Sequence, residues 1–138
     1  MRVKTVTRLG SLAMLGGITV LLSPAPGLSQ ATELAMLSQL EAGAWDIRIR
    51  PGNRKERICV RTGRDLIQLR HQSQPCSQFV VEDTADRVTV QYTCKDQGYG
   101  RTRIRRENNG LVQIETQGLI RGQPFALSAE ARRTGPCN

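Results

Sequence analysis

The chain has 138 residues, which is enough for one domain, and its 20 basic and 12 acidic side chains give a formal charge of +8. A basic surface favours anionic partners but also keeps a protein in solution, so the charge selects no single function. The chain has one histidine and 4% aromatic residues. This composition argues against a nucleic-acid surface, which needs aromatic side chains interleaved with basic ones, and against histidine-assisted nucleophilic catalysis.

The first segment is typical of a secretory signal. Arg2, Lys4 and Arg8 precede an apolar run over residues 9–22, and a proline-containing breaker follows the run. Small residues then stand at the two positions that a signal peptidase reads, the second being Ala31. A membrane-spanning helix needs about 20 apolar residues, which is more than this run offers.

We therefore expect residues 1–31 to be a cleaved signal peptide. Residues 32–138 are then a single exported domain, periplasmic or secreted, with no membrane span in the mature form. Cleavage removes three basic residues and no acidic one, which lowers the formal charge from +8 to +5. The mature domain remains basic.

Two stretches have a helical pattern. In residues 32–41 the side chains of Leu34, Leu37 and Leu40 recur at three-residue spacing, which predicts a short N-terminal helix. A second apolar cluster predicts one helical turn near Leu66. Both are short, and the rest of the domain is expected to be strands.

In the remaining sequence apolar residues recur at every second position, which predicts strands joined by turns. A loop at residues 51–54 pairs Ile47 with Ile58 and Trp45 with Val60. The later loops are placed at residues 83–86, 96–98, 108–110 and 121–122. The cross-strand pairs that these loops imply are Val81 with Val88, Val90 with Ile104, Ile104 with Ile114, and Ile114 with Ala129.

The later loop assignments support one another, because a shift of one residue in any strand register would expose a whole row of apolar side chains to solvent. Together they place one set of apolar side chains on a single face: Phe79, Val81, Val88, Val90, Ile104, Ile114, Leu127 and Ala129. The predicted fold class is mainly β. It is a single antiparallel meander, either a curled sheet or a small barrel, with one dry face.

All four cysteines lie in the exported part, and an even number in an oxidising compartment predicts two disulfides. Their spacings are wide and lack the close pairs of a structural zinc site. Four cysteines allow three pairing schemes. We favour a disulfide between Cys59 and Cys76, which closes the loop around Leu66. The second disulfide then joins Cys94 to Cys137 and ties the C-terminal tail to a central strand.

No residue is assigned to catalysis, a cofactor or a metal. The sole histidine, His71, lies in a polar loop and is expected to be solvated, without the partners that a general base needs. A pocket with polar groups clustered around Tyr92, Thr102 and Thr116 would instead indicate an enzyme of the hydrolase type. The sequence therefore favours a domain without enzymatic activity.

Three arginines are the sharpest surface feature. In the predicted register Arg101, Arg103 and Arg105 point away from the dry face, about 6.6 Å apart along one strand. Their expected neighbours on the next strand are glutamines and one acidic residue, Glu115. Two interpretations stay open. One is a solvated outer face with a single weak ion pair. The other is an anion-binding strip for lipid head groups, polysaccharide or an acidic protein, since guanidinium groups match phosphate and carboxylate.

The residues that carry a family resemblance are Gly43-Ala44-Trp45-Asp46, Ile58-Cys59-Val60, Cys94 and Arg133-Thr134-Gly135-Pro136-Cys137. With them the chain resembles, over nearly all of its mature part, the small exported bacterial family known as domain of unknown function 3617. Asp46 stands where that family often has glutamate, and Arg61-Thr62 stands where it often has a Thr-Pro pair. The resemblance implies a periplasmic bacterial protein, supplies no catalytic residue, and leans toward the favoured disulfide scheme.

These observations favour a periplasmic, non-enzymatic domain that binds a component of the cell envelope. The alternative is a structural or stress accessory of the envelope without a small ligand, and an enzyme is the third and least favoured function. A curled sheet with a ligand-sized cavity would favour binding, whereas a filled interior would favour the accessory. We expect no nucleic-acid partner and no cofactor.

Overall fold

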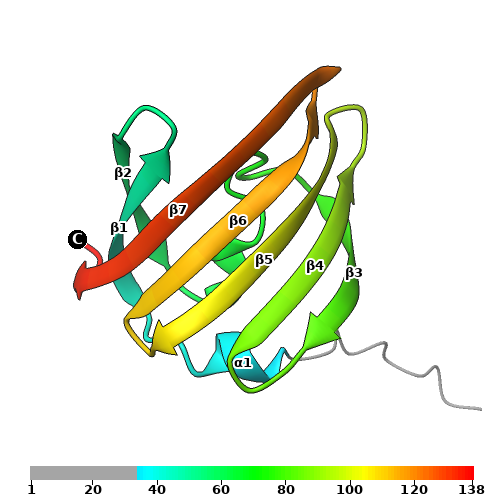
Figure 1. Ribbon diagram of the computed structural model, residues 1–138. Helices are drawn as coiled ribbons and strands as arrows, with labels where there is room; N and C mark the ends of the chain where they lie inside the picture. Colours follow the sequence, from blue (N-terminus) through cyan, green and yellow to red (C-terminus); the bar gives the residue numbers. More distant parts are fainter. Residues whose placement is uncertain (1–33) are drawn as a thin grey trace, which may run out of the picture. The chain divides into compact units, whose positions relative to one another are not determined.

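The computed structural model describes residues 34–138, where the chain forms seven strands, one short helix and one 3-10 turn, η1 (Figure 1). The predicted signal peptide, residues 1–31, lies outside the described residues. The elements are α1 (Ala35–Ser38), β1 (Gly43–Arg50), β2 (Arg54–Val60), η1 (Gly63–Leu66), β3 (Cys76–Asp83), β4 (Arg87–Cys94), β5 (Gly98–Asn108), β6 (Leu111–Ile120) and β7 (Gln123–Gly135).

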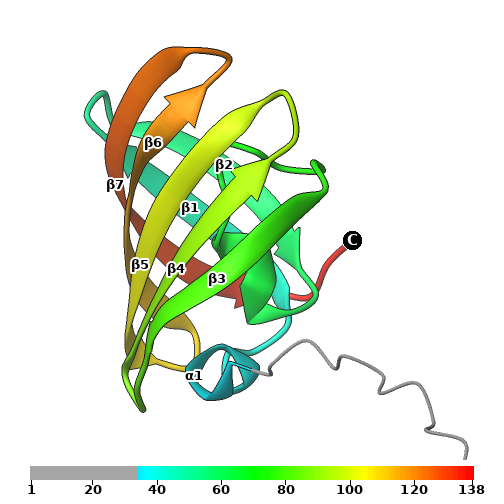
Figure 2. The same cartoon turned by 90° about the vertical axis from the view of Figure 1, so that its right-hand side faces the viewer.

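All seven strands belong to one antiparallel sheet, in the order β2-β1-β7-β6-β5-β4-β3. The strands from β3 to β7 follow one another as a meander, and β1 pairs with β7 at the far side. The edge strands β2 and β3 are not paired with each other, so the sheet curls without closing into a barrel (Figure 2). The predicted fold class, mainly β with a single curled antiparallel sheet, is confirmed.

The last two hairpins have the predicted register. Ile104 faces Ile114 between β5 and β6, and Ile114 faces Ala129 between β6 and β7. The second of these hairpins turns at Arg121 and Gly122, whose φ angles of 49° and 78° are both positive. Two-residue turns with positive φ match the twist of paired strands, which is why this turn sets the register so firmly.

In two other hairpins the cross-strand register differs from the predicted register by two residues. Trp45 faces Ile58 in the β1–β2 pair, and Val88 faces Ile104 in the β4–β5 pair, so the pairs expected there were wrong. Each loop starts one residue earlier than expected. A shift of two leaves every side chain on its expected face, because strand side chains alternate with a period of two. The predicted core residues of these strands are therefore unaffected.

The β3–β4 hairpin differs in a way that does change faces. Val80 faces Val90, and the register shifts between Val80 and Glu82. As a result, residues of β3 that were predicted to point inward point outward: Phe79 is 70% exposed and Val81 is 44% exposed. The prediction that both lie on the dry face was wrong. An extra residue in an edge strand reverses the alternation locally, and apolar periodicity does not reveal it.

The core lies on the inner face of the sheet, where α1 and the connection from β2 to β3 cover it. That connection is seen behind the sheet in Figure 1. Trp45 is fully buried, and its indole Nε1 donates a hydrogen bond to the carbonyl of Glu41 at 3.0 Å. The N-terminal helix is shorter than predicted, yet all three leucines of its pattern, Leu34, Leu37 and Leu40, are buried.

The helical turn predicted near Leu66 is confirmed as η1. It begins after Thr62, whose side chain and the carboxylate of Asp65 form a capping box. The Asp65 carboxylate accepts hydrogen bonds from the backbone N–H groups of Arg61 and Thr62, at 2.8 and 3.2 Å. Such a box satisfies the donors that the start of a helix leaves free. The turn carries Leu66 and Ile67 into the core, where both are fully buried.

Candidate functional site

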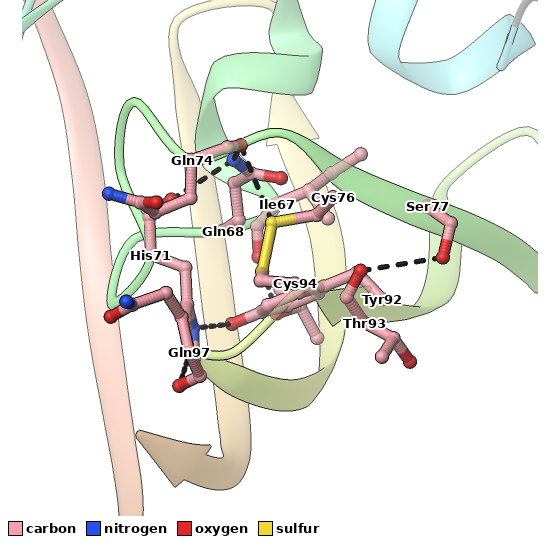
Figure 3. Close-up of a disulfide and its surroundings, with 11 residues drawn as sticks. Ile67, Gln68, His71, Gln74, Cys76, Ser77, Tyr92, Thr93, Cys94 and Gln97 are labelled. Atoms are coloured by element: carbon pink, nitrogen blue, oxygen red, sulfur yellow. Dashed lines mark hydrogen bonds between the residues drawn. A yellow bond between two sulfur atoms is a disulfide. The ribbon is translucent and has the colours of Figure 1, made fainter. Parts of the chain in front are cut away.

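Both disulfides differ from the favoured scheme, which was therefore wrong. Cys76 is joined to Cys94, with Cα atoms 4.1 Å apart, and Cys59 is joined to Cys137, with Cα atoms 5.5 Å apart. Cys76 lies directly opposite Cys94 in the β3–β4 pair, and Figure 3 shows this bond at the end of the hairpin. Two disulfides are typical of proteins from oxidising, extracytoplasmic compartments.

The second disulfide depends on a strand pair that the sequence pattern did not predict. Cys59 faces Ala44 in the β1–β2 pair, and Ala44 faces Gly135 in the β1–β7 pair. The tail beyond Gly135 therefore ends beside β2, within reach of Cys59. The first disulfide could have been found from the sequence, since any hairpin turning at residues 83–86 places Cys76 close to Cys94.

His71 is buried, at 2% exposure, so the expectation of a solvated loop histidine was wrong. On the inner face the strands bring Tyr92, Gly100, Gly118 and Phe125 into line as successive cross-strand partners. Two residues without side chains thus lie between two aromatic rings. The imidazole packs against both rings, with centroids 5.3 Å from Tyr92 and 6.0 Å from Phe125. The β2–β3 connection inserts this ring into the core.

Hydrogen bonds hold His71 in one orientation (Figure 3). Its Nε2 donates to the backbone carbonyl of Gln97 at 3.2 Å, because a carbonyl oxygen can only accept. In the neutral ring Nδ1 then accepts from the hydroxyl of Tyr92 at 3.1 Å. Burial raises the pKa of the Tyr92 phenol above its ordinary value, and the neighbouring Thr116 hydroxyl, the positive charge of Arg70 and the Thr102 hydroxyl oppose this rise.

Thr102 and Thr116 form a buried polar cluster together with His71 and Tyr92. Thr102 donates to the backbone carbonyl of Ile67, which lies on the β2–β3 connection. Since a hydroxyl has one proton, the 2.8 Å contact between Thr102 and Thr116 is then donated by Thr116. The side chains of His71, Tyr92, Thr102 and Thr116 are each at most 3% exposed. This cluster therefore anchors the connection to the sheet from inside the core.

The outer face of the sheet, opposite the core, holds the predicted arginines. Arg101, Arg103 and Arg105, which we call the basic strip, are exposed and alternate along β5 with buried residues. Their partners on β6 are Gln117, Glu115 and Gln113, as the predicted register required.

Two members of the basic strip have carboxylate partners. The Arg103 guanidinium lies 3.6 Å from Glu115, and that of Arg105 lies 2.7 Å from Glu107. Among the described residues the side chain of Arg101 has no hydrogen bond or ion pair. Exposed pairs contribute only ~0–1 kcal/mol each, so the carboxylates leave the arginines free to exchange partners.

A groove crosses the outer face beside the basic strip. Its volume is about 550 Å³, and Ala126 and Ser128 of β7 form part of its lining. Arg101 and Arg103 stand on one side, and Arg50 stands on the other. Small residues on β7 leave room above the strand, while the strands on either side carry long side chains.

Arg50 lines the groove because β1 pairs with β7. Arg103 faces Glu115, Glu115 faces Ser128, and Ser128 faces Arg50. The backbones of Arg103 and Arg50 are therefore three strands apart, about 14 Å at ordinary strand spacing. Among the described residues the side chain of Arg50 has no hydrogen bond or ion pair. Sequence reasoning missed Arg50, because nothing local in the sequence places the first strand beside the last.

A second hollow, of about 610 Å³, adjoins the groove and is lined by Arg87 and Arg105 as well as by Arg50 and Arg103. Within residues 34–138 no helix is long and apolar enough to span a membrane. In the same residues no three His, Cys, Asp or Glu side chains are arranged to hold a metal ion.

Comparison with known proteins gives no relative for this chain: no family model, no curated protein and no solved structure matches it. The resemblance to domain of unknown function 3617 therefore stays a prediction.

Proposed function

We propose that this protein is an exported, non-enzymatic domain that binds an anionic component of the cell envelope on the outer face of its sheet. The observation that carries the proposal is the groove, which has Arg50 on one side and Arg101 and Arg103 on the other. A concave site with cations on opposite sides can surround an anion, whereas a flat row of arginines contacts it from one side only.

The chemistry of the groove suits phosphate and carboxylate groups. A guanidinium offers paired N–H donors that match two oxygens of such an anion, and it stays charged at all physiological pH values. The side chains of Arg50 and Arg101 have no partner among the described residues, so an anion bound to these two displaces no carboxylate. Arg103 is paired with Glu115, which also lines the groove, so an anion there competes with that carboxylate. The hydroxyl of Ser128 and the amide of Gln117, which also line the groove, add neutral hydrogen-bonding groups.

Export to the periplasm is part of the proposal. It rests on the signal-like segment of residues 1–31 and on the two disulfides, which are stable where thiols are oxidised. In that compartment the available anions include lipid head groups and acidic polysaccharides.

The second candidate function is a structural or stress accessory of the envelope without a small ligand. The observation that favours it is the inner face, where the β2–β3 connection and His71 occupy the centre of the curled sheet. A ligand bound inside the sheet would have to displace these buried side chains. Binding on the outer face does not, and this is why we place the site there.

Titration with dextran sulfate, a soluble polyanion, tests the proposal. We expect binding at about 0.05 M salt that weakens steeply toward 0.5 M, because salt screens exposed charges. Arg50→Gln combined with Arg101→Gln should weaken binding roughly 5- to 30-fold, the equivalent of about 1–2 kcal/mol. The charge-matched control, Arg54→Gln with Arg61→Gln, changes two exposed arginines outside the groove and should leave the affinity within about twofold of the parent. Equal losses in both variants would leave only the accessory function.

A further inference from the structure

One end of the outer face is apolar. Tyr99, Leu119 and Pro124 are successive cross-strand partners on β5, β6 and β7. They share the face of the basic strip, because Tyr99 precedes Arg101 by two residues and strand side chains alternate. Tyr99 is 47% exposed, which is high for a large aromatic side chain.

Phe79 is a further exposed apolar side chain, at the edge of the sheet. It faces Gln91 in the β3–β4 pair, and Gln91 faces Arg101 in the β4–β5 pair. The bulge that follows Val80 belongs to the same strand, and Phe79 stays outside the core, 70% exposed. Tyr99 and Phe79 therefore flank Arg101, from its own strand and from two strands away. We call Tyr99, Leu119, Pro124 and Phe79 the apolar end.

We propose that the anion is presented by a membrane, and that the protein docks with the apolar end and the basic strip on a leaflet that contains anionic lipids. This inference rests on the proposed function. Amphipathic aromatic rings favour the head-group level of a bilayer, and arginines beside them are attracted to lipid phosphates. Stable attachment without a spanning helix usually takes both an apolar and a basic signal.

The arrangement fits a membrane better than a dissolved anion. A soluble polyanion gains nothing from contact with apolar side chains. Exposure of such side chains to water is unfavourable, and it commonly marks a contact surface. The outer face is also the convex side of a curled sheet (Figure 2). A convex surface meets a flat leaflet along a limited strip, and Tyr99 and Arg101 lie two residues apart on the same strand, β5. Apolar and cationic groups therefore reach the same plane together.

Vesicle binding tests this inference. Vesicles of phosphatidylcholine with about 30% phosphatidylglycerol should bind the mature domain at low salt, and pure phosphatidylcholine vesicles should bind it at least tenfold more weakly. Phe79→Ser with Tyr99→Ser should weaken binding to the anionic vesicles roughly tenfold and leave dextran sulfate binding unchanged. Arg50→Gln with Arg101→Gln should weaken both.

A gain-of-signal variant guards against misfolding of the serine variant. Trp45 is the single tryptophan and is fully buried, so its emission should not respond to vesicles. In Phe79→Trp the new indole should shift its emission to shorter wavelength when anionic vesicles are added, and brominated lipid should quench it.

The outcomes separate the two proposals. If dextran sulfate binds, but the serine variant keeps its vesicle affinity and the emission of the Phe79→Trp variant does not shift, the membrane inference fails and the proposed function stands. If neither dextran sulfate nor anionic vesicles bind, the proposed function fails and the inference with it. If the serine changes alter only the elution volume of the protein, the apolar end is an interface with a second copy, and the membrane inference is wrong.

Discussion

Tyr92 faces Gly100 across β4 and β5, and its ring occupies the space that a side chain on Gly100 would need. Gly100→Ala should lower the free energy of unfolding by about 1–3 kcal/mol, because overpacking a buried site forces side chains off their preferred positions. Gly110→Ala is the matched control, since a Cβ there makes only ordinary contacts. It should change stability by no more than about 0.5 kcal/mol. Urea denaturation of both variants measures the difference, and equal effects would contradict the packing described for Tyr92.

The raised pKa of Tyr92 predicts a loss of stability at alkaline pH. A group whose pKa is raised on folding contributes stability that is fully present below its unfolded pKa, about 10 for tyrosine, and that is lost as pH rises through its folded pKa. Above about pH 10 the unfolded chain ionises first, so unfolding is favoured. Tyr92→Phe should be less stable at neutral pH, because His71 loses a partner, but its stability should fall less between about pH 9 and 11.5. Urea midpoints across this range test it, and parallel pH profiles for parent and variant would count against the prediction.

Removal of each disulfide should destabilise the domain by a different amount. By loop entropy, the bond between Cys59 and Cys137, which spans 78 residues, contributes ~4.5 kcal/mol. The bond between Cys76 and Cys94, which spans 18 residues, contributes ~3 kcal/mol. Paired Cys→Ala variants in urea measure both. Peptide mapping without reduction checks the connectivity, and recovery of a peptide that joins Cys59 to Cys76 would refute it.

The basic strip should contribute to binding and little to folding. Arg101→Gln, Arg103→Gln and Arg105→Gln together remove two exposed ion pairs, so the unfolding free energy should change by less than about 1 kcal/mol. Salt-sensitive binding to dextran sulfate should fall further than in the Arg50 and Arg101 double variant. If the triple variant binds as tightly as the parent at low salt, the strip is only a solvated face.

Local sequence determined much of the sheet. The alternation along β5 placed Arg101, Arg103 and Arg105 outward, and the turn at Arg121 and Gly122 set the last hairpin. Both depend on neighbours in the chain: side chains alternate in any strand, and a two-residue turn leaves one register to the strands that it joins. Where a loop was predicted one residue too late, the apolar residues of the two strands that it joins still lie on the predicted face.

Tertiary structure decided the rest, because it depends on contacts between residues far apart in sequence. The pairing of β1 with β7 brings Arg50 to the groove and Cys137 to Cys59, and no local pattern selects one distant strand over another. His71 is buried against the rings of Tyr92 and Phe125, which lie on two strands far from it in sequence. Periodicity reports which face of a strand is apolar, but not what packs against that face or which strand lies beside it.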